Sequence, residues 1–436
     1  MGSIGQPTNG TGVYVASDPS VYGEYETKWS TLPTNESEWL QRARDVAAVL
    51  AIDAGKRDKE NKSPVAEVAL LKHAGLLKVL GLRKYGGGEQ EWSVGYKVIR
   101  EVAKGDGSIG MLLGYSLLWS TIGNVVGTAE QADEWQREII SKNLFVGGAV
   151  NPRNADLKIN DEGEELVFNG FKFFNTGGVV SDVTVLEGVL EGTEDHVFAI
   201  VPTRQEGIQF GHDWDNVGLR LTESGSVKIN NVRTPWKNAL GWDSTTKKPR
   251  AEVLAIPFAT LLLPTIQLVF SNFYLGISLG AIDHASTYTK TKTRPWPYGG
   301  DNKEKASDEF YILATYGNFH AHLRAATALT DRAGILASTL YTKYGGQNRA
   351  ALTAQERGEF AEEVASVKVV TTDTGLRVTA GVFEVTGASA TRAVVGLDRF
   401  WRDVRTHTLH DPVAYKNREL GRYQLFGEIP EVTWYT

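Results

Sequence analysis

The chain has 436 residues, 42% of them hydrophobic and 22% charged, which is typical of a globular protein of about three domains at roughly 150 residues each. Its net charge of -6 argues against nucleic acid as a partner, since binding to a phosphate backbone needs a basic surface. The absence of cysteine excludes disulfides, thiolate nucleophiles, iron–sulfur clusters and cysteine zinc sites, so redox chemistry would need a bound organic cofactor.

The N-terminal third divides into an arm and a helical domain. Residues 1–30 start with a polar, glycine-rich stretch without an apolar core, so we expect a disordered or extended arm and no signal peptide. Over 31–143 the apolar residues recur at helical spacing, as in Trp39, Ala43 and Val46. We therefore predict an all-helical domain with loops at 85–88 and 104–108.

From 144 to 242 the hydrophobic period changes to two, in short runs rich in Val, Phe and Ile that Gly, Asn and Asp separate. This pattern predicts a compact antiparallel, β-barrel-like domain. Long helical runs return over 243–436 and predict a four-helix bundle with a C-terminal tail. The apolar stretch 254–270 contains two prolines and several polar residues, so we expect a buried helix and no membrane span.

Five segments at the joints of this layout resemble, in order and spacing, motifs of the acyl-CoA dehydrogenase superfamily. They are Tyr85-Gly-Gly-Gly88, Gly127-Thr-Ala-Glu-Gln131, the segment 147–156, the segment 170–178 and the segment 218–235. The resemblance implies that family's α+β multidomain fold, a homotetramer and a bound flavin. It assigns the flavin edge to five residues, whose backbone N–H groups can approach the ring beside glycines: Gly148, Ala149, Val150, Asn175 and Thr176.

Two departures from the family pattern change the expected chemistry. Asp411, preceded by His410 and followed by Pro412, stands where the dehydrogenases carry their catalytic glutamate. It is one methylene shorter, and the proline biases it away from helix, so it is a poor copy of that base. The segment 385–391 replaces the family's adenine-binding Gly-Gly-x-Gly, which favours FMN over FAD.

The segments 400–412 and 294–296 are similar to the dibenzothiophene monooxygenase branch of the family. This resemblance implies a monooxygenase that uses reduced FMN and O2 through a C4a-hydroperoxyflavin, with FMNH2 delivered by a separate NAD(P)H:flavin reductase. The expected substrate is a small organic molecule that is oxygenated at sulfur, nitrogen or an activated carbon. A cytoplasmic location is expected, because neither end resembles a secretion, retention or peroxisomal address.

The same resemblance implies roles for individual residues. His410 is the expected hydrogen-bond donor and proton shuttle, because imidazole titrates near neutral pH, and His407 lies one helical turn before it. The catalytic set is His410, Tyr115 and Asp411. The remaining cofactor contacts are Trp214 as a ring wall, Arg294 as a phosphate ligand, His407 and Ser389, and the substrate pocket is assigned to Met111, Tyr115 and Ser116.

Met111, Gly148 and Ser389 differ from the residues of the sulfur-oxidising enzymes, so dibenzothiophene itself is not predicted as the substrate. No His, Asp and Glu spacing indicates a metal site; His320 and His322 would face different sides of a helix. Two alternatives remain. One is an FAD-dependent acyl-CoA dehydrogenase or oxidase with Asp411 as base, and the other is a catalytically silent flavin-fold binding protein.

Overall fold

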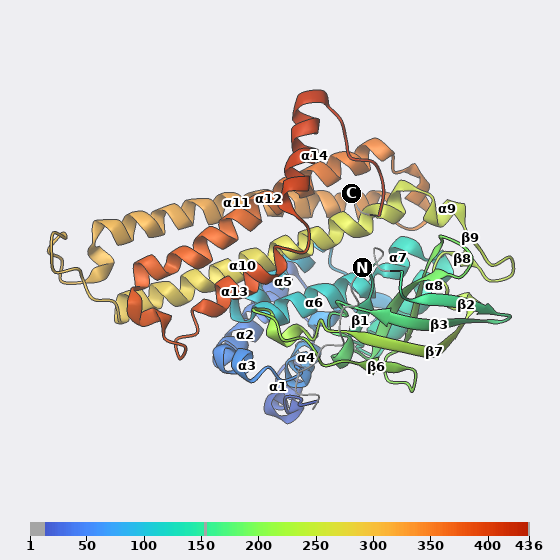
Figure 1. Ribbon diagram of the computed structural model, residues 1–436, viewed down its shortest axis with the longest axis horizontal. Coiled ribbons are helices and arrows are strands. Elements are labelled where there is room, and N and C mark those ends of the chain that lie inside the picture. The colour runs from blue at the N-terminus through green and yellow to red at the C-terminus, as the bar shows by residue number, and fades with distance from the viewer. Residues whose placement is uncertain (1–13, 152–154, 435–436) are drawn as a thin grey trace, which may run out of the picture.

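The computed structural model describes residues 14–151 and 155–434. Figure 1 shows three parts along the chain: a first group of helices below the centre, a β-sheet at one end, and long helices that cover both and project away from the sheet. The predicted fold, with helical, β and helical domains in this order, is confirmed.

The first helical part begins well before residue 31. Its helices are α1 (Glu24–Lys28), α2 (Glu36–Ala51), α3 (Ala54–Glu60), α4 (Val65–His73), α5 (Trp92–Gly105), α6 (Gly107–Ser120), α7 (Ile122–Val126) and α8 (Ala129–Ser141), with 3₁₀ turns η1 (Pro19–Tyr22), η2 (Leu76–Lys78) and η3 (Arg83–Tyr85). Asp106 caps α6 through its side chain, and Thr128 and Gln131 form a capping box at α8.

The predicted disordered or extended arm differs from the structure over its described part, residues 14–30. Ser17 donates a hydrogen bond to Glu67 (2.7 Å), and the rings of Tyr22 and Trp29 are buried against the helical core. These aromatic side chains give the segment enough apolar surface to pack. Residues 1–13 lie outside the described residues.

The β domain contains one larger sheet and one small pair of strands. Its strands are β1 (Val146–Ala149), β2 (Lys158–Glu162), β3 (Glu165–Lys172), β4 (Val183–Leu190), β5 (His196–Pro202), β6 (Ile208–Phe210), β7 (Val227–Pro235), β8 (Trp242–Asp243) and β9 (Lys248–Pro249), with 3₁₀ turns η4 (Gly178–Val180), η5 (Arg220–Thr222) and η6 (Trp236–Asn238). The sheet order is β1-β4-β2-β3-β7-β6, with β5 beside β4.

Most strand pairs are antiparallel, as predicted, but β4 runs parallel to β1 and to β2. A period of two shows that one face of a strand is buried and carries no information about the direction of its neighbour. The small pair β8–β9 also carries the β structure past residue 242, where the sequence predicted that this domain ends.

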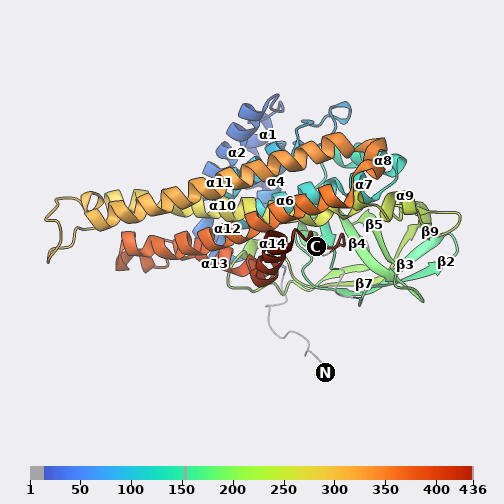
Figure 2. The same cartoon turned by 90° about the horizontal axis from the view of Figure 1, so that it is seen from above.

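The C-terminal part is built on three long helices and three shorter ones. The elements are α9 (Ala251–Leu254), α10 (Leu262–Thr291), α11 (Phe310–Tyr344), α12 (Ala354–Thr386), α13 (Asp398–His407) and α14 (Val413–Phe426), with 3₁₀ turns η7 (Pro257–Leu261), η8 (Ala306–Asp308), η9 (Gly346–Ala351) and η10 (Ala388–Thr391). Viewed from above in Figure 2, α10, α11 and α12 run side by side along the long axis.

Helix α10 joins the two helical parts, because it packs on α5 and α6 as well as on α11, α12 and α13. The spans 107–126 and 257–291 are each long and apolar enough to cross a membrane, but 89% of either window is buried within the protein. Their hydrophobic side chains therefore pack inside the protein core. For the apolar stretch at the start of α10, this agrees with the buried helix that the sequence predicted.

Candidate functional site

A cavity of about 440 Å³ opens where the three parts of the molecule meet. Helix α6, the connections after β1 and β3, the loop before η5, the start of α10 and the segment that ends α13 all contribute to its wall. The lining residues are Met111, Tyr115, Val150, Asn151, Phe174, Thr176, Trp214, Asn216, Leu219, Ser224, Leu263, Thr406, His407, Leu409, His410, Asp411 and Trp434.

His407, the last residue of α13, is held on both ring nitrogens by tyrosines. Its Nδ1 lies 2.7 Å from Tyr274 Oη and its Nε2 lies 3.3 Å from Tyr115 Oη. Burial, with smaller contributions from the charges of His410 and Lys368, lowers the pKa of His407 well below that of free histidine. His407 is therefore neutral at physiological pH, with one ring nitrogen that donates and one that accepts.

His410 and Asp411 form the half-exposed edge of the same wall. The His410 ring stacks on that of His407 at 5.2 Å between centroids, and its Nδ1 lies 3.1 Å from Asp411 Oδ1. Burial raises the pKa of Asp411, but the hydrogen bond and charge of His410 and the charge of Lys368 outweigh it and keep this pKa below the usual range. Asp411 is therefore an ionised and weakly basic carboxylate.

The β-domain wall of the cavity is fixed by a buried ion pair. Lys172 and Glu187 are both 0% exposed and lie 2.8 Å apart. Lys172 Nζ donates to the Asn151 carbonyl (3.1 Å), and Glu187 accepts the Asn151 N–H (3.1 Å). His196 also bonds to the Glu187 carboxylate. The backbone at Asn151, which follows β1 and lines the cavity, is thus held by charged groups behind it.

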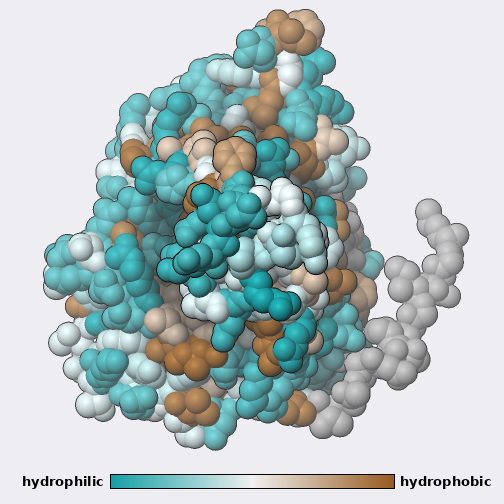
Figure 3. Space-filling view, turned by 90° about the vertical axis from the view of Figure 1, so that its left-hand side faces the viewer, coloured by the Kyte–Doolittle hydropathy of each residue, from teal (hydrophilic) through white to brown (hydrophobic). Residues whose placement is uncertain are grey.

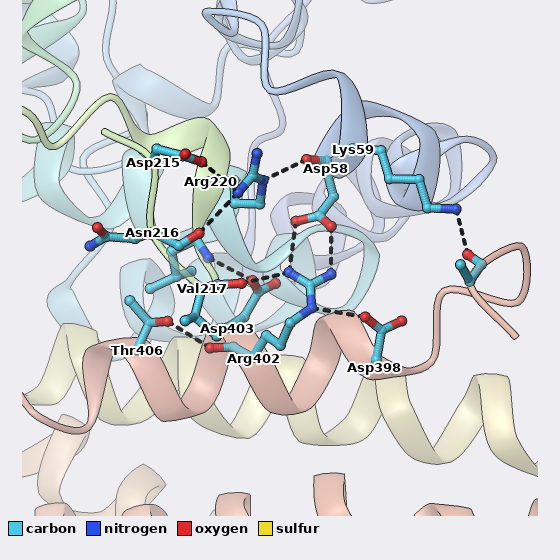
Figure 4. A network of polar contacts seen from close by, with 12 residues as sticks. Asp58, Lys59, Asp215, Asn216, Val217, Arg220, Asp398, Arg402, Asp403 and Thr406 are labelled. Carbon is cyan, nitrogen blue, oxygen red and sulfur yellow. Dashed lines mark hydrogen bonds and ion pairs between the residues drawn. The ribbon is translucent and has the colours of Figure 1, made fainter. Parts of the chain in front are cut away.

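The loop that carries Trp214 and Leu219 is tied to α13 by the polar network of Figure 4. The guanidinium of Arg402 donates to Asp58 of α3 (2.5 Å) and to the carbonyl of Val217 (2.7 Å). Arg220 donates to the Asp58 carbonyl (2.9 Å), so one aspartate contacts both sides of the junction. The network places the Trp214 side of the cavity against the helix that ends in His407.

Two contacts make this junction tight. Asp403, fully buried one residue after Arg402, accepts the N–H of Leu219 (2.7 Å). Burial raises the pKa of Asp403 to about 7, partly offset by the charge of Arg399 and this N–H. Gly218 lies so close to α13 that a Cβ there would meet the carbonyl carbon of Arg402 at 2.2 Å. Only glycine fits at this approach of loop and helix.

The lining fits a flat aromatic cofactor with a polar edge. Phe174 and Trp214 meet edge to face at 6.4 Å, and the left-handed backbone of Phe174 (φ 61°) holds its exposed ring beside the cavity. Thr176 Oγ1 lies 2.9 Å from Ser224 Oγ in the wall. The buried amide of Asn175, just behind, has no partner for either polar atom among the described residues, so it is open to a ligand.

Gly148 has a steric role that the sequence did not reveal. A Cβ at this position would lie 2.4 Å from Trp119 Nε1, so the missing side chain makes room for a buried indole. That N–H has no partner among the described residues. Strand β1, which carries Gly148 and Ala149, is an edge strand, and one row of its backbone groups is not used by the ladder.

The structure gathers most of the predicted site residues around one cavity. Met111, Tyr115, Val150, Thr176, Trp214, His407, His410 and Asp411 line it. Gly148, Ala149 and Asn175 lie buried in the strand and turn behind the wall. The predicted segment 147–156 includes residues 152–154, which lie outside the described residues.

Three more predicted site residues do not line the cavity. Ser116 is buried and accepts the N–H of Val146, so it holds β1 instead of facing a substrate. Arg294 is exposed and follows α10, whose 30 residues span about 45 Å. Ser389 lies in η10 at the same far end, where Thr293 Oγ1 donates to the Thr386 carbonyl (3.0 Å). Within one chain, neither Arg294 nor Ser389 can contact a cofactor in this cavity.

The sequence did not predict several residues that line the cavity, nor the residues that lie behind His407. The missed wall residues are Asn151, Phe174, Asn216, Leu219, Ser224, Leu263, Thr406, Leu409 and Trp434, and the layer behind His407 adds Gln267, Phe270, Tyr274 and Lys368. Six of the missed wall residues belong to segments that resemble motifs of the family or of its monooxygenase branch and were within reach of that argument: Asn151, Phe174, Leu219, Ser224, Thr406 and Leu409. The other residues carry no sequence signal, because chain folding alone brings them to the site.

Comparison with known proteins gives two family matches and several similar relatives. Residues 34–143 match the model for the acyl-CoA dehydrogenase N-terminal domain, and residues 268–414 match that for the acyl-CoA dehydrogenase C-terminal domain. A dibenzothiophene monooxygenase of Rhodococcus qingshengii is 36% identical over 401 residues, covering 89% of this chain and 93% of that protein. A probable FMNH2-dependent monooxygenase, SfnC of Pseudomonas putida, is 34% identical over 91% of this chain and 97% of its own.

Solved structures give the same picture. The methanesulfinate monooxygenase MsuC from Pseudomonas fluorescens superposes with a TM-score of 0.85 at 35% identity, over 91% of this chain and 99% of that one. FMN-bound TdsC from Paenibacillus sp. A11-2, a dibenzothiophene monooxygenase, gives 0.83 at 31% identity over 91% of this chain and 100% of its own. The similarity therefore covers all three parts of the fold.

Proposed function

This chain belongs to the acyl-CoA dehydrogenase family and is a flavin-dependent oxidoreductase, and we propose that it works as a reduced-FMN-dependent monooxygenase. In this proposal one atom of O2 goes to a small organic substrate and the other leaves as water. The reduced flavin comes from a separate NAD(P)H:flavin reductase. The FMNH2 dependence named for SfnC supports the cofactor.

The observation that carries the proposal is the chemistry of the wall at the end of α13. Asp411 occupies the position expected for a dehydrogenase base, yet its pKa is held low by His410 and Lys368, and such a carboxylate is a weak acceptor for a proton on carbon. His410 and Tyr115 can present hydrogen-bond donors to the cavity, and His407 contacts the Tyr115 hydroxyl. This set is suited to stabilising and protonating oxygen species.

Reduced FMN, when bound, would supply two electrons and activate O2. Phe174 and Trp214 would flank the ring, and Thr176 and Asn175 would face its polar edge. The buried Lys172–Glu187 pair keeps the Asn151 backbone in place. The chain's own contribution is thus to bind, orient and shield the ring from water.

The substrate side of the cavity is apolar. Met111, Leu263 and Leu409 face it together with the aromatic rings of Phe174 and Trp434. Such a lining favours a small apolar or aromatic molecule that presents a sulfur, a nitrogen or an electron-rich carbon toward His410. Structures of TdsC with bound indole agree with an aromatic occupant of this size.

We further propose a homotetramer, in which the far end of α10 of one copy reaches the cavity of another. Figure 3 looks onto that end, whose nearest surface is mainly hydrophilic, as expected for a contact with a phosphate. Arg294 and Ser389 lie there, and an apolar, exposed tip of α14 with Leu425 and Phe426 offers further surface for assembly.

The assembly proposal predicts that Arg294→Ala weakens FMN binding without moving any residue of its own cavity. Size-exclusion chromatography with light scattering should give a tetramer for both proteins. A monomer, or an Arg294→Ala tetramer that binds FMN normally, would contradict it.

The decisive experiment mixes anaerobic protein that holds reduced FMN with oxygenated buffer in a stopped-flow spectrometer. We expect a transient absorbance that belongs to neither reduced nor oxidised FMN and lives longer than free flavin allows. His410→Ala should shorten its lifetime and divert the electrons to hydrogen peroxide, since the donor that protects the oxygen species is lost. Immediate reoxidation by the wild-type protein would sink the monooxygenase proposal.

Two simple assays separate the alternatives. Anaerobic bleaching of bound oxidised flavin by an acyl-CoA would favour an FAD-dependent dehydrogenase with Asp411 as base. Protein that binds neither FMN nor FAD, as measured by equilibrium dialysis, would favour a catalytically silent member of the family.

A further inference from the structure

Lys368 of α12 is a buried cation that the proposed function does not yet use. Its side chain is 0% exposed and lies over the rings of Tyr274 and Phe270, at 5.0 and 5.7 Å from their centroids. Its ammonium donates a hydrogen bond to Tyr274 Oη (3.0 Å). Within the described part of the chain we find no carboxylate within 4.0 Å of it. Burying a cation without a close anion is costly, and such groups are enriched at functional sites.

The hydrogen bonds lead from Lys368 to the cavity in one direction. An ammonium only donates, so Tyr274 Oη accepts from it. The hydroxyl hydrogen of Tyr274 has two acceptors on His407, the ring Nδ1 at 2.7 Å and the backbone carbonyl at 3.1 Å, and we assign it to the shorter contact with Nδ1. His407 then carries its proton on Nε2, which donates to Tyr115 Oη at 3.3 Å. The hydroxyl hydrogen of Tyr115, which lines the cavity, is left to donate to whatever is bound there.

We propose that Lys368, Tyr274, His407 and Tyr115 form a buried proton relay, in which Lys368 supplies the proton that Tyr115 delivers into the cavity. The inference rests on the proposed function. Reduced FMN as its monoanion, O2 and the substrate yield oxidised FMN, oxygenated substrate and water only if one proton is taken up.

Each hop breaks one bond to hydrogen and forms another. The Lys368 proton passes to Tyr274 Oη, and the former hydroxyl proton of Tyr274 passes to His407 Nδ1. The Nε2 proton of His407 passes to Tyr115 Oη, and that of Tyr115 to an anionic oxygen in the cavity. Lys368 ends as a neutral amine and His407 as its other tautomer. When the cavity is open to water, the reverse sequence returns a proton to Lys368.

The protonation equilibria agree with this direction. Burial lowers the pKa of Lys368 to about 8, opposed by the charge of Asp411 and assisted by that of Lys416, so the ammonium can release a proton near neutral pH. Burial, with Asp411, raises the pKa of Tyr115 and Tyr274, so both stay hydroxyls and pass protons by exchange.

Several ionisable groups face the relay from the packed elements and belong to its pH dependence. They are Tyr115 on α6, Tyr274 on α10, Arg405 and His407 on α13, His410 and Asp411 in the loop after it, and Lys416 on α14. None of them replaces Lys368 as the first donor, because Lys368 is the group bonded to Tyr274 on the side away from His407.

Two substitutions at Lys368 separate proton supply from positioning. Lys368→Met removes both the proton and the donor. Lys368→Gln keeps an N–H that can donate to Tyr274 but has no proton to release. Tyr274→Phe breaks the chain one step later. Thr371→Val serves as the matched control, because Thr371 is buried on the same helix and its hydroxyl donates, among the described residues, to carbonyls of that helix alone.

The first measurement uses flavin-free protein labelled with ¹⁵N-histidine. NMR of the wild type, of Thr371→Val and of Lys368→Gln should show neutral His407 with its proton on Nε2. Tyr274→Phe should lose this preference, since the donor to Nδ1 is gone. A wild-type His407 that carries its proton on Nδ1 would overturn the relay, whether or not the protein proves to be a monooxygenase.

The second measurement follows product and hydrogen peroxide per reduced FMN as a function of pH. In the wild type and Thr371→Val we expect coupling to fall as pH rises through about 8. Lys368→Met, Lys368→Gln and Tyr274→Phe should each lower the rate of the oxygen-dependent steps at least about 10-fold and lose this pH dependence. Wild-type rates in Lys368→Gln would overturn Lys368 as proton source. Failure of the wild type to oxygenate any substrate would instead count against the proposed function.

Discussion

Two lysines lie fully buried beside the cavity, Lys172 in the sheet and Lys368 in the long helices, and their surroundings differ. Lys172 has a carboxylate at 2.8 Å and carbonyl contacts, so its charge is compensated within the β domain. Lys368 has a tyrosine hydroxyl and aromatic rings around it. A compensated buried charge holds a structure in place, whereas an uncompensated one is ready to lose its proton.

The largest loss of stability should come from removing one partner of the buried Lys172–Glu187 ion pair. Lys172→Met would leave the carboxylate of Glu187 buried without the ammonium that lies 2.8 Å from it, and we expect a loss of about 3–5 kcal/mol in the free energy of unfolding. Urea denaturation measures it. The double substitution Lys172→Met and Glu187→Met is the control and should recover most of the loss, because no charge is then left unpaired. A single variant as stable as the wild type would contradict the structural role.

The prediction of intermediate size concerns the buried aspartate Asp403 and the pH dependence of stability. Its folded-state pKa of about 7 lies above the ordinary aspartate value of 3.8, so the folded chain binds more protons than the unfolded chain between these values. The free energy of unfolding therefore contains a term that falls by about 1.4 kcal/mol per pH unit as pH rises through this window. Asp403→Asn removes the term and keeps an oxygen to accept the Leu219 N–H.

We expect Asp403→Asn to match the wild type in stability near pH 4 and to exceed it at pH 8. Urea denaturation of both proteins at the two pH values gives the difference. Equal differences at pH 4 and pH 8 would show that Asp403 does not titrate in this window.

The smallest change in stability should follow from removing the uncompensated cation. The folded-state pKa of Lys368, about 8, lies below the ordinary lysine value of 10.5, so the unfolded chain binds more protons than the folded chain between these values. This charge thus costs stability below pH 8, and the cost fades as pH rises toward 10.5. Lys368→Met should unfold at an unchanged free energy, or at one raised by about 1 kcal/mol, at pH 7. A loss comparable to that of Lys172→Met would erase the distinction between the two lysines.

The fold could be predicted from the sequence because the sequence patterns that indicate it are local. Helical spacing, the change to a period of two and five glycine-rich joints are properties of short segments, and each depends on backbone geometry that neighbouring residues decide. The direction of β4 and the packing of residues 14–30 were not foreseen, because both depend on partners far along the chain.

For the site, the sequence predicted those residues that lie inside a segment with a recognisable family motif. His407, His410 and Asp411 came from the segment 400–412 and do line one cavity. Arg294 came from the same reasoning, yet its distance from the cavity depends on the length and direction of α10, which its own motif does not encode.

What the sequence by itself determined is the family, the order of the domains and the chemical character of the wall at the end of α13. Only the tertiary structure decided which charges are buried together. Lys368 sits in an ordinary helical segment and its tyrosine partner is 94 residues away. The sequence does not show whether a lysine on a helix faces water or the core, and the packing around the lysine sets its pKa.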